Sequence, residues 1–401
     1  MSNKKNVLFL GNSGFPYGLA EVQKILLISK CLVSTGNNVT VVCNTGVHKK
    51  KDHPEMTETG EFQGIHYIYT SGTPFYHEHL ISRNLLKIKG AVKEIQLIIR
   101  RARDKKLDYA ILSTHQFFSV FIYFILSRLF GFKVILNYVE YSSGIKKEWY
   151  RFRTILNDKL FDKYAPLLAD GILPISEFLI NHLKKIAPKK SYFKIPGLTD
   201  YDRYNDIETL EQDKYFLFCG AANYKETVFF IIDSFAALNS CGKDLSLFLV
   251  INGNPNDVKD IKDYINSNVK KDSIKFFTKL SDKQLTTYYK NALALLIPLR
   301  PTFQDIARFP HKIGEYLGSG NPVISTNIGE VKYYFKDMGE MLIADEYNID
   351  KFAAKMQSVI DDPEAAKKIG EQGKKLGLSI FHYQTKAPEI NNFLDKFNHK
   401  Q

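Results

Sequence analysis

The chain has 401 residues, and 44% of them are apolar, which is enough for the cores of two domains. Its four cysteines form no Cys-x-x-Cys pair, so the composition gives no disulfide framework or zinc site and suits a reducing compartment. The formal charge of +12 favours anionic partners. No nucleic-acid-binding module is recognisable, which leaves phosphorylated metabolites and anionic lipid.

The apolar stretches are too short to cross a bilayer. The longest, Phe117–Phe130, contains two serines and an arginine and falls short of the roughly 20 residues that a transmembrane helix needs. The N-terminal run Val7–Leu10 is too short for the core of a signal peptide and ends at Gly11. We therefore expect a cytoplasmic protein that is soluble or bound peripherally to the inner face of a membrane.

Short β-branched runs alternate with longer amphipathic segments in the first half, a pattern typical of a parallel sheet flanked by helices. The predicted strands are Asn6–Leu10, Asn38–Cys43, His66–Tyr69, Tyr109–Ser113, Lys133–Asn137 and Gly171–Pro174. The predicted helices include Leu19–Thr35, Asn84–Lys105 and Phe117–Phe130. The pattern breaks around Pro196 and Gly197, where we place a linker.

The same alternation restarts after the linker. Strands are predicted at Tyr215–Cys219, Leu245–Asn252, Ile274–Phe277, Leu293–Pro298 and Pro322–Thr326. Helices are predicted at Thr227–Ser240, Val258–Asn268, Asp282–Asn291 and His311–Gly318. The fold class is therefore α/β, with two doubly wound domains at 1–195 and 205–375. A C-terminal helix within 376–401 is expected to cross back to the first domain.

A glycine-rich turn, Gly11–Gly18, follows the first predicted strand and precedes a helix, so its backbone amides could face an anion. The spacing is not Gly-x-Gly-x-x-Gly. No Asp or Glu occurs from Val22 to Lys51, where a dinucleotide fold needs an acid for the ribose. The first half is thus a poor site for NAD, and the loop is either an anion-facing turn or a plain tight turn.

The segment Arg308–Ile324 carries a sharper pattern. Pro310 fits the first turn of a helix, Gly318 to Gly320 end it, and Pro322 opens a strand. The N-terminus of that helix would face the carboxyl edge of the sheet, where free amides and the helix dipole stabilise a diphosphate.

Lys312 and Glu315 lie three residues apart and share one helix face, so together they offer a cation to phosphate and a carboxylate to ribose hydroxyls. The alternative is a simple surface ion pair. Lys225 follows the strand Tyr215–Cys219 and a small-residue turn that holds Gly220 and Asn223. It would approach the same edge as Lys312, or else be a solvated lysine.

These segments resemble family 4 glycosyltransferases, the large retaining group with the GT-B fold, in which two Rossmann-like domains face each other across a cleft. Glu315–Ile324 resembles the Glu-Ala-x-Ala-x-Gly-x-Pro-Val-Ile signature, and Cys219-Gly220 with Lys225 resembles the strand–glycine–loop–lysine element. Gly14–Gly18 resembles the N-terminal glycine loop, and Ile172–Glu177 resembles the serine-bearing strand end. The resemblance follows the chain in order along nearly its whole length.

The resemblance implies roles for single residues. Glu315 would bind the donor ribose and Lys225 would neutralise the departing diphosphate. The amides of Gly14 and Gly18 would face that diphosphate from the other domain. His115 matches the histidine that lies near the reacting sugar, although a lone histidine is also commonly structural.

The chain departs from the family at Ala307, eight positions before Glu315, where a glutamate is usual. It is similar here to a variant group with an Arg-Phe-Pro-x-Lys element, which is formed by Arg308, Phe309, Pro310 and Lys312. Asp305 could then hydrogen-bond the sugar, and Lys312 could supplement Lys225 on phosphate.

The family uses no metal, so cationic side chains and helix amides would carry the electrostatics of transfer. No Asp-x-Asp element stands at a strand end, because Asp361-Asp362 precedes Pro363 in a helical tail. No metal site and no cofactor are expected, with a UDP- or GDP-sugar as the donor substrate. Glu140, after another strand, would lie on the acceptor side or be a buried pairing residue.

Basic residues gather in 87–106 and 146–153, with Ile88, Val92 and Ile98 interleaved at helical spacing. Such a helix lies on anionic lipid, or is a solvated outer helix whose apolar stripe packs on the sheet. On lipid, the acceptor would be lipid-linked, as in cell-envelope polysaccharide synthesis; otherwise it is a glycan. A sugar-nucleotide epimerase of the same fold and a non-catalytic GT-B partner subunit are the rival functions.

Overall fold

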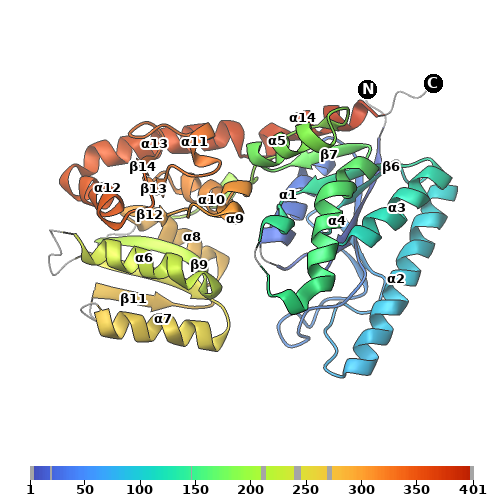
Figure 1. Cartoon of the computed structure of the whole chain (residues 1–401), viewed down its shortest axis with the longest axis horizontal. Coiled ribbons are helices and arrows are strands. Elements are labelled where there is room, and N and C mark those ends of the chain that lie inside the picture. Colours follow the sequence, from blue (N-terminus) through green and yellow to red (C-terminus); the bar gives the residue numbers. More distant parts are fainter. Residues whose placement is uncertain are drawn as a thin grey trace. The chain divides into compact units, whose positions relative to one another are not determined.

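The computed structural model describes residues 4–18, 20–145, 147–208, 214–238, 245–268 and 273–397. The chain forms two units: Met1–Leu198 together with Tyr383–Gln401, and Thr199–His382 (Figure 1). The return to the first unit starts later than the predicted residue 376, because the helix before it continues to Ile380.

The first unit is built on an eight-stranded sheet with the order β3-β4-β2-β1-β5-β6-β7-β8. All pairs are parallel except β3 with β4. The strands are β1 (Asn6–Asn12), β2 (Asn38–Cys43), β3 (Thr59–Phe62), β4 (Ile65–Tyr69), β5 (Tyr109–Leu112), β6 (Lys133–Tyr138), β7 (Gly171–Pro174) and β8 (Ser191–Tyr192). The six predicted strands are confirmed, with small shifts at their ends.

Sequence patterns did not predict the two edge strands. β3 contains a glycine and a glutamate and has no buried residue, so it lacks the apolar alternation of a strand. β8 is two residues long and is held by its neighbour β7. Edge strands bury little surface, and their sequences therefore carry little pattern.

Right-handed crossovers decide which helices cover each face of this sheet. The step from β1 to β2 runs one way along the sheet, whereas the steps β4–β5, β5–β6 and β6–β7 run the other way. Helix α1 (Ala20–Ser34) therefore covers one face. Helices α2 (Leu80–Arg103), α3 (Phe117–Phe130) and α4 (Phe152–Leu168) lie side by side on the other (Figure 1).

Helix boundaries differ modestly from prediction. Helix α2 begins at Leu80 rather than Asn84 and ends at Arg103, because Lys105 takes a positive φ of 54°. The start predicted at Leu19 lies outside the described residues. Helix α5 (Glu177–Ile186) is capped by the Ser176 hydroxyl, which accepts a hydrogen bond from the amide of Leu179.

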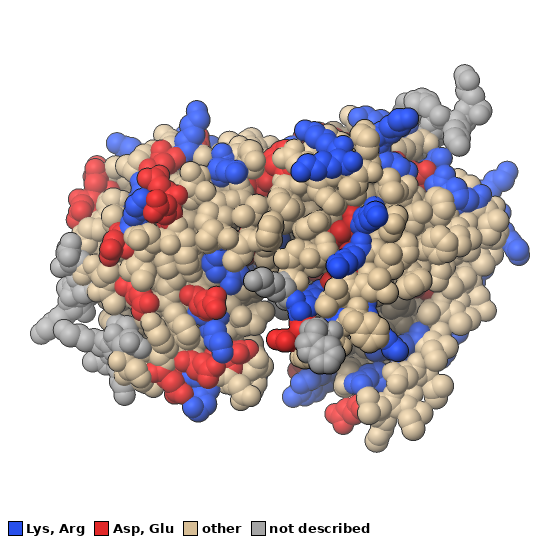
Figure 2. All heavy atoms as spheres, viewed as in Figure 1, with Lys and Arg blue, Asp and Glu red and all other residues tan. Residues whose placement is uncertain are grey.

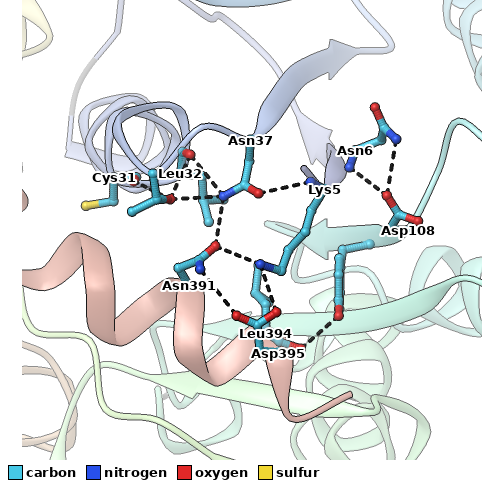
Figure 3. Close-up of polar contacts among 11 residues, drawn as sticks. Lys5, Asn6, Cys31, Leu32, Asn37, Asp108, Asn391, Leu394 and Asp395 are labelled. Atoms are coloured by element: carbon cyan, nitrogen blue, oxygen red, sulfur yellow. Dashed lines mark hydrogen bonds and ion pairs between the residues drawn. The ribbon is translucent and has the colours of Figure 1, made fainter. Parts of the chain in front are cut away.

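Helix α14 (Tyr383–Asp395) completes the first unit by packing on α1. Its Ile390 and Phe393 belong to the same apolar core as β1 and β2. Figure 3 shows how Lys5, which is buried, reaches this helix: its ammonium lies 2.9 Å from Asn391 Oδ1 and 2.9 Å from Asp395 Oδ1. Segments from opposite ends of the chain thus share one core and one polar cluster.

The second unit is built on a six-stranded parallel sheet with the order β11-β10-β9-β12-β13-β14. The strands are β9 (Lys214–Ala221), β10 (Leu245–Asn252), β11 (Ile274–Phe277), β12 (Ala294–Ile297), β13 (Val323–Thr326) and β14 (Leu342–Ala344). The five predicted strands are confirmed. β14 is only three residues long, and no pattern of its own predicted it.

The helices of this unit are α6 (Lys225–Ala236), α7 (Pro255–Asn268), α8 (Asp282–Asn291), α9 (Phe303–Ala307), α10 (His311–Ser319), α11 (Val331–Tyr334), α12 (Ile349–Asp361) and α13 (Pro363–Ile380). Helix α6 begins two residues before its predicted start, so Lys225 is its first residue. Helix α6 ends at Ala236, earlier than predicted, and the predicted last residues Asn239 and Ser240 lie outside the described residues.

Both sheets reverse their strand order once. The reversal lies between β1 and β5 in the first unit and between β9 and β12 in the second. Loops on either side of such a reversal part at the carboxyl edge of the sheet and leave room for a ligand. The candidate site residues are therefore expected in the loops after these four strands. None of the described helices has the length and apolarity needed to span a membrane.

Candidate donor and acceptor sites

Glu315 lies on α10 with only 7% of its surface exposed. Its Oε2 accepts a hydrogen bond of 2.7 Å from Lys312 Nζ, while His311 Nε2 and Arg203 Nη1 lie 3.6 Å and 3.8 Å from Oε1. Burial alone would raise the pKa of Glu315, but the charges of Lys312, His311 and Arg203 outweigh it and lower the pKa to about 2. Glu315 is therefore a permanently charged acceptor for hydroxyl donors.

Lys312 does pair with Glu315, as their spacing indicated. The Lys312 ammonium also donates to the Tyr289 hydroxyl at 3.0 Å. Burial lowers its pKa, but the Glu315 charge more than offsets this, so the pKa is raised overall. Glu315 is buried and Lys312 is partly buried, so the alternative of a simple surface ion pair is wrong.

Sequence patterns missed Arg203, which comes from the short 3-10 helix Tyr201–Tyr204 at the start of the second unit. Its Nε and Nη2 donate to Thr286 Oγ1 at 3.2 Å and 2.9 Å, which aims Nη1 toward Glu315. Tyr204 in the same turn donates its hydroxyl to the backbone carbonyl of Glu315. The segment looked like a linker, and only tertiary packing brings it to α10.

Pro310 was predicted to lie in the first turn of α10, but in the structure it is the N-cap residue that precedes the helix. Its ψ of 118° is extended, and the helix starts at His311. A proline has no side chain that can accept a hydrogen bond, so Pro310 makes no side-chain cap on α10. Because α10 connects the parallel strands β12 and β13, its N-terminus faces the carboxyl edge of the sheet. The predicted direction of this helix is thus confirmed.

Lys225 lies at the N-terminus of α6, after the turn with Gly220 and Asn223. Its ammonium is 2.7 Å from Asp260 Oδ2 and 3.7 Å from Asp257 Oδ1, both on α7. The hydrogen bond to Asp260 and its charge raise the pKa of Lys225. Lys225 and Lys312 therefore have separate carboxylate partners.

The loop after β12 contains the other nominated residues. Asp305 on α9 accepts hydrogen bonds from the backbone amide and the Nε of Arg300, each at 2.9 Å. Arg308 Nη1 donates to the Tyr224 hydroxyl at 2.9 Å, which connects this loop to the turn after β9. The two loops that flank the strand reversal are thus in contact.

Phe309 and Ala307 face inward. The Phe309 ring packs on Tyr334 and Phe381 and is only 4% exposed, so it anchors the loop and offers no open ring to a ligand. Ala307 is buried at the end of α9, where a glutamate side chain would have to enter the core.

In the first unit, the loop after β1 and the residues after β5 flank the strand reversal. Gly14 has a φ of 96°, a conformation that favours glycine, and a Cβ at Gly18 would lie 2.8 Å from Val22 Cβ. The backbone conformation at Gly14 and the close contact at Gly18 are therefore structural reasons for a glycine at each position.

His115, just after β5, has a buried Nδ1 with no hydrogen-bond partner among the described residues. Glu21, in the first turn of α1, interacts electrostatically with His115 and with Glu140 after β6. Burial raises the pKa of Glu21, with Glu140 adding to it and His115 opposing it. Sequence patterns missed Glu21, although an acid in the first turn after the glycine loop was a visible signal.

A separate pocket of about 620 Å³ lies between β4 and α2, and its lining includes Glu58, Lys93 and Arg100. None of the nominated site residues lines it. Within the described ranges, no three His, Cys, Asp or Glu side chains are grouped as metal ligands would be.

Residues 201–376, nearly the whole second unit, match the family model "Glycosyl transferases group 1". The second unit is thus similar to this glycosyltransferase family over nearly its whole length. The match covers the segments with Glu315, Lys312 and Lys225, and it confirms the family-level resemblance drawn from the motifs.

The chain is also similar to an uncharacterised glycosyltransferase of Methanocaldococcus jannaschii, with 24% identity over 55% of this chain and 58% of that protein. It thus spans a little over half the length of this curated relative.

Solved glycosyltransferases share the whole fold. Sucrose-phosphate synthase from Thermosynechococcus elongatus superposes with a TM-score of 0.76 at 14% identity, over 98% of this chain and 99% of that one. Anabaena HepE in complex with UDP superposes with a TM-score of 0.69 at 14% identity, over 98% and 100%. The predicted GT-B fold class is confirmed.

Proposed function

We propose that this protein is a retaining glycosyltransferase that moves a sugar from a nucleoside diphosphate donor to a glycan or lipid-linked acceptor. The observation that carries the proposal is Glu315, an ionised and nearly buried carboxylate near the N-terminus of α10, in the unit that matches glycosyl transferases group 1. The similar fold of Anabaena HepE, solved in complex with UDP, supports a nucleotide-sugar as the donor.

The proposed donor site uses charges that the second unit already holds in place. Glu315 accepts hydrogen bonds from the ribose hydroxyls, and the cations of Lys312 and Arg203, with His311 beside them, keep it charged without reorganisation. The diphosphate lies at the N-terminus of α10, where amides and the helix dipole stabilise negative charge. Lys225 and Arg308 supply further positive charge to the same group.

The proposed reaction uses no metal and no cofactor. The leaving diphosphate is stabilised by these amides and cations, and its oxygen accepts the proton of the attacking hydroxyl on the same face, so the anomeric configuration is retained. Gly14 and Gly18 present backbone amides to the diphosphate. His115 and Glu140 contact the reacting sugar and acceptor, and Asp305 reads sugar hydroxyls in place of the glutamate missing at Ala307.

The proposed setting is polysaccharide assembly at the cytoplasmic side of the cell envelope. The exposed basic charge of the first unit supports an anionic surface as the place where a lipid-linked acceptor is met.

The test measures the melting temperature of the full chain with each member of a panel of UDP-, GDP- and other activated sugars. We expect one nucleotide class to raise the melting temperature and Glu315→Gln to weaken its affinity at least tenfold. The matched control is Glu371→Gln, at an exposed position of α13, which should bind as the wild type does.

The products then separate the reaction classes. Transfer to an added acceptor supports the proposal. Conversion of the donor to its epimer would instead indicate an epimerase. No stabilisation by any donor, together with no hydrolysis and no transfer, would overturn the proposal.

A further inference from the structure

Helix α2 has two apolar faces. Leu97, Ile98 and Ala102 are buried against the rest of the unit. A second stripe, Ile81, Leu85, Ile88 and Val92, has the spacing of one helix face but is exposed, with 79% of Ile81 open to solvent. The packing of α2 on its own unit therefore leaves half of its apolar surface uncovered.

The neighbouring helix α3 continues this surface. Its exposed large apolar side chains are Phe118, Phe121, Ile122, Ile125 and Leu129, which lie on one face at helical spacing and form one stripe. Phe118 is 66% exposed. Two large aromatic rings and three branched aliphatic side chains on one outer helix face are unusual for a surface that meets only water.

Helix α4 adds a third stripe beside α3, made of Phe152, Leu156, Tyr164 and Leu167. We call the combined outer surface of α2, α3 and α4 the outer helical face. Most of the exposed large apolar side chains in the described part of the chain lie on these three helices. Figure 2 shows this part of the first unit as tan surface broken by blue side chains.

The charges on the outer helical face have one sign. The acidic residues of α2, α3 and α4 are Glu94, Asp158 and Asp162, and all three are buried. The exposed charges of the three helices are lysines and arginines, among them Lys89, Lys93, Arg103, Arg153, Lys159 and Lys163 on α2 and α4. The face is thus apolar along its stripes and positive around them.

This combination decides between partners. A second copy of the chain would bring like charges together, which disfavours a symmetric interface. A nucleic acid would satisfy the lysines and arginines but leave three apolar stripes facing phosphate and water. An anionic bilayer satisfies both, because acyl chains accept the apolar side chains and headgroups accept the cations.

We propose that the outer helical face binds an anionic lipid bilayer, with the α3 stripe inserted among the headgroups and acyl chains. Lipid binding as such rests only on this surface, whereas its use in catalysis rests on the proposed transferase function. His115 directly precedes Gln116 and α3, so the site residue of the first unit lies next to the membrane-facing helix. A hydroxyl on a lipid-linked acceptor would then meet the reacting sugar close to the bilayer surface.

The test is co-sedimentation of the full chain with phosphatidylcholine vesicles that contain 30 mol% phosphatidylglycerol, compared with pure phosphatidylcholine vesicles. We expect binding to the anionic vesicles and at least tenfold weaker binding to the neutral ones. Phe118→Ser combined with Leu129→Ser should weaken binding to anionic vesicles at least tenfold. Arg103→Glu combined with Lys159→Glu should weaken it too and reduce its dependence on salt.

The matched control is Met338→Ser combined with Leu378→Ser, two exposed apolar side chains of the second unit, which should bind vesicles as the wild type does. Equal weakening by this control, or no preference for anionic vesicles, would overturn the proposal. A wild-type dimer that Phe118→Ser with Leu129→Ser converts to a monomer would also overturn it, because the face would then be an interface between copies.

Nucleotide-sugar binding separates this proposal from the proposed function. The variants that weaken vesicle binding should keep the wild-type thermal shift with the donor, since the substituted side chains lie at solvent-facing positions of the first unit. A chain that binds vesicles but no nucleotide-sugar would support the lipid surface and contradict the transferase proposal.

Discussion

Lys24 on α1 is buried, with 6% of its surface exposed, and its ammonium has no hydrogen-bond partner among the described residues. Burial lowers its pKa to about 7. An unpaired buried cation costs free energy whenever it is charged, so below pH 7 folding must either bury the charge or release the proton.

The pKa of Lys24 is about 7 in the folded chain and about 10.4 in the unfolded chain, and this difference sets how stability changes with pH. Between pH 7 and about pH 10.4, the unfolded chain holds the Lys24 proton and the folded chain does not, so stability rises with pH across this window. Below pH 7 both states are protonated and the full penalty is present.

We predict that Lys24→Met stabilises the protein at pH 7 by about 2 to 4 kcal/mol and removes the part of the rise in stability above pH 7 that Lys24 causes. Urea unfolding at pH 7 and pH 9.5 measures both effects. Lys30→Met, a half-buried lysine of the same helix over the Tyr383 ring, is the control and should change stability little. An equally stable or less stable Lys24→Met would contradict the prediction.

Glu315 shows the opposite way to bury a charge. It is as deeply buried as Lys24, but Lys312, His311 and Arg203 surround it, so its pKa falls to about 2 instead of rising. Two of these three partners lie on α10 and could be read from spacing. Arg203 lies more than a hundred positions earlier, so no local pattern could have connected it with Glu315.

At the scale of elements, α14 is held by a polar cluster beneath β1 and α1 (Figure 3). Lys5 Nζ bonds Asn391 and Asp395, Asn37 Nδ2 donates to Asn391 Oδ1 at 2.9 Å, and the Tyr109 hydroxyl donates to the Leu394 carbonyl at 2.7 Å. These hydrogen bonds hold α14 at one position along its axis, which apolar contacts alone would not fix because they are not directional.

We predict that Lys5→Met lowers the free energy of unfolding by about 2 kcal/mol, because it leaves Asp395 and Asn391 without their cation. The value is modest because the Asp395 side chain is 36% exposed and water screens part of the loss. Limited proteolysis should cut α14 faster in this variant.

Lys396→Met is the control, since this exposed lysine adjoins Asp395 and packs only over the Phe393 ring in the contacts described. If both variants lose stability and α14 protection equally, the cluster around Lys5 does not hold the helix.

The glycines of α13 illustrate what an element's own sequence does not reveal. A Cβ at Gly370 would lie 2.5 Å from the carbonyl oxygen of Gly320, and one at Gly373 would lie 2.5 Å from that of Glu340. Glycine weakens a helix, so its use here looks unfavourable locally. The close approach of α13 to the turn that ends α10 and to the segment before β14 is the reason, and only the packed structure shows it.

At the scale of the whole molecule, the two strand reversals define where a donor should bind. The turns after β9 and β12, joined by the bond between Arg308 and Tyr224, both belong to the second unit. On the proposed function, a nucleotide bound at this edge would order backbone amides in these loops and at the N-terminus of α10.

We predict that the donor slows hydrogen–deuterium exchange most strongly in peptides covering 220–226 and 300–316. Exchange measured with and without the best nucleotide-sugar of the panel checks this, and Glu315→Gln should abolish the protection at the same donor concentration. Protection confined to the first unit would place the donor site elsewhere and contradict the prediction.

The sequence by itself determined the class and order of the central elements. Eleven of the fourteen strands in the described part of the chain were predicted, because most buried parallel strands are short β-branched runs between helical periods. It also determined the direction of α10 and the pairing of Lys312 with Glu315, since both depend on residues within one turn or one strand–helix unit. The family resemblance rested on the same local motifs.

Only the tertiary structure decided the rest. Arg203 reaches Glu315, Glu21 approaches His115 and Lys5 binds α14 through contacts between distant segments, and such contacts leave no periodicity in the chain. The stripes of α2, α3 and α4 have the spacing of core-facing helices, and the sequence could not say which stripe the sheet covers. The sheet has one face on that side, so each helix buries one stripe and leaves the other exposed.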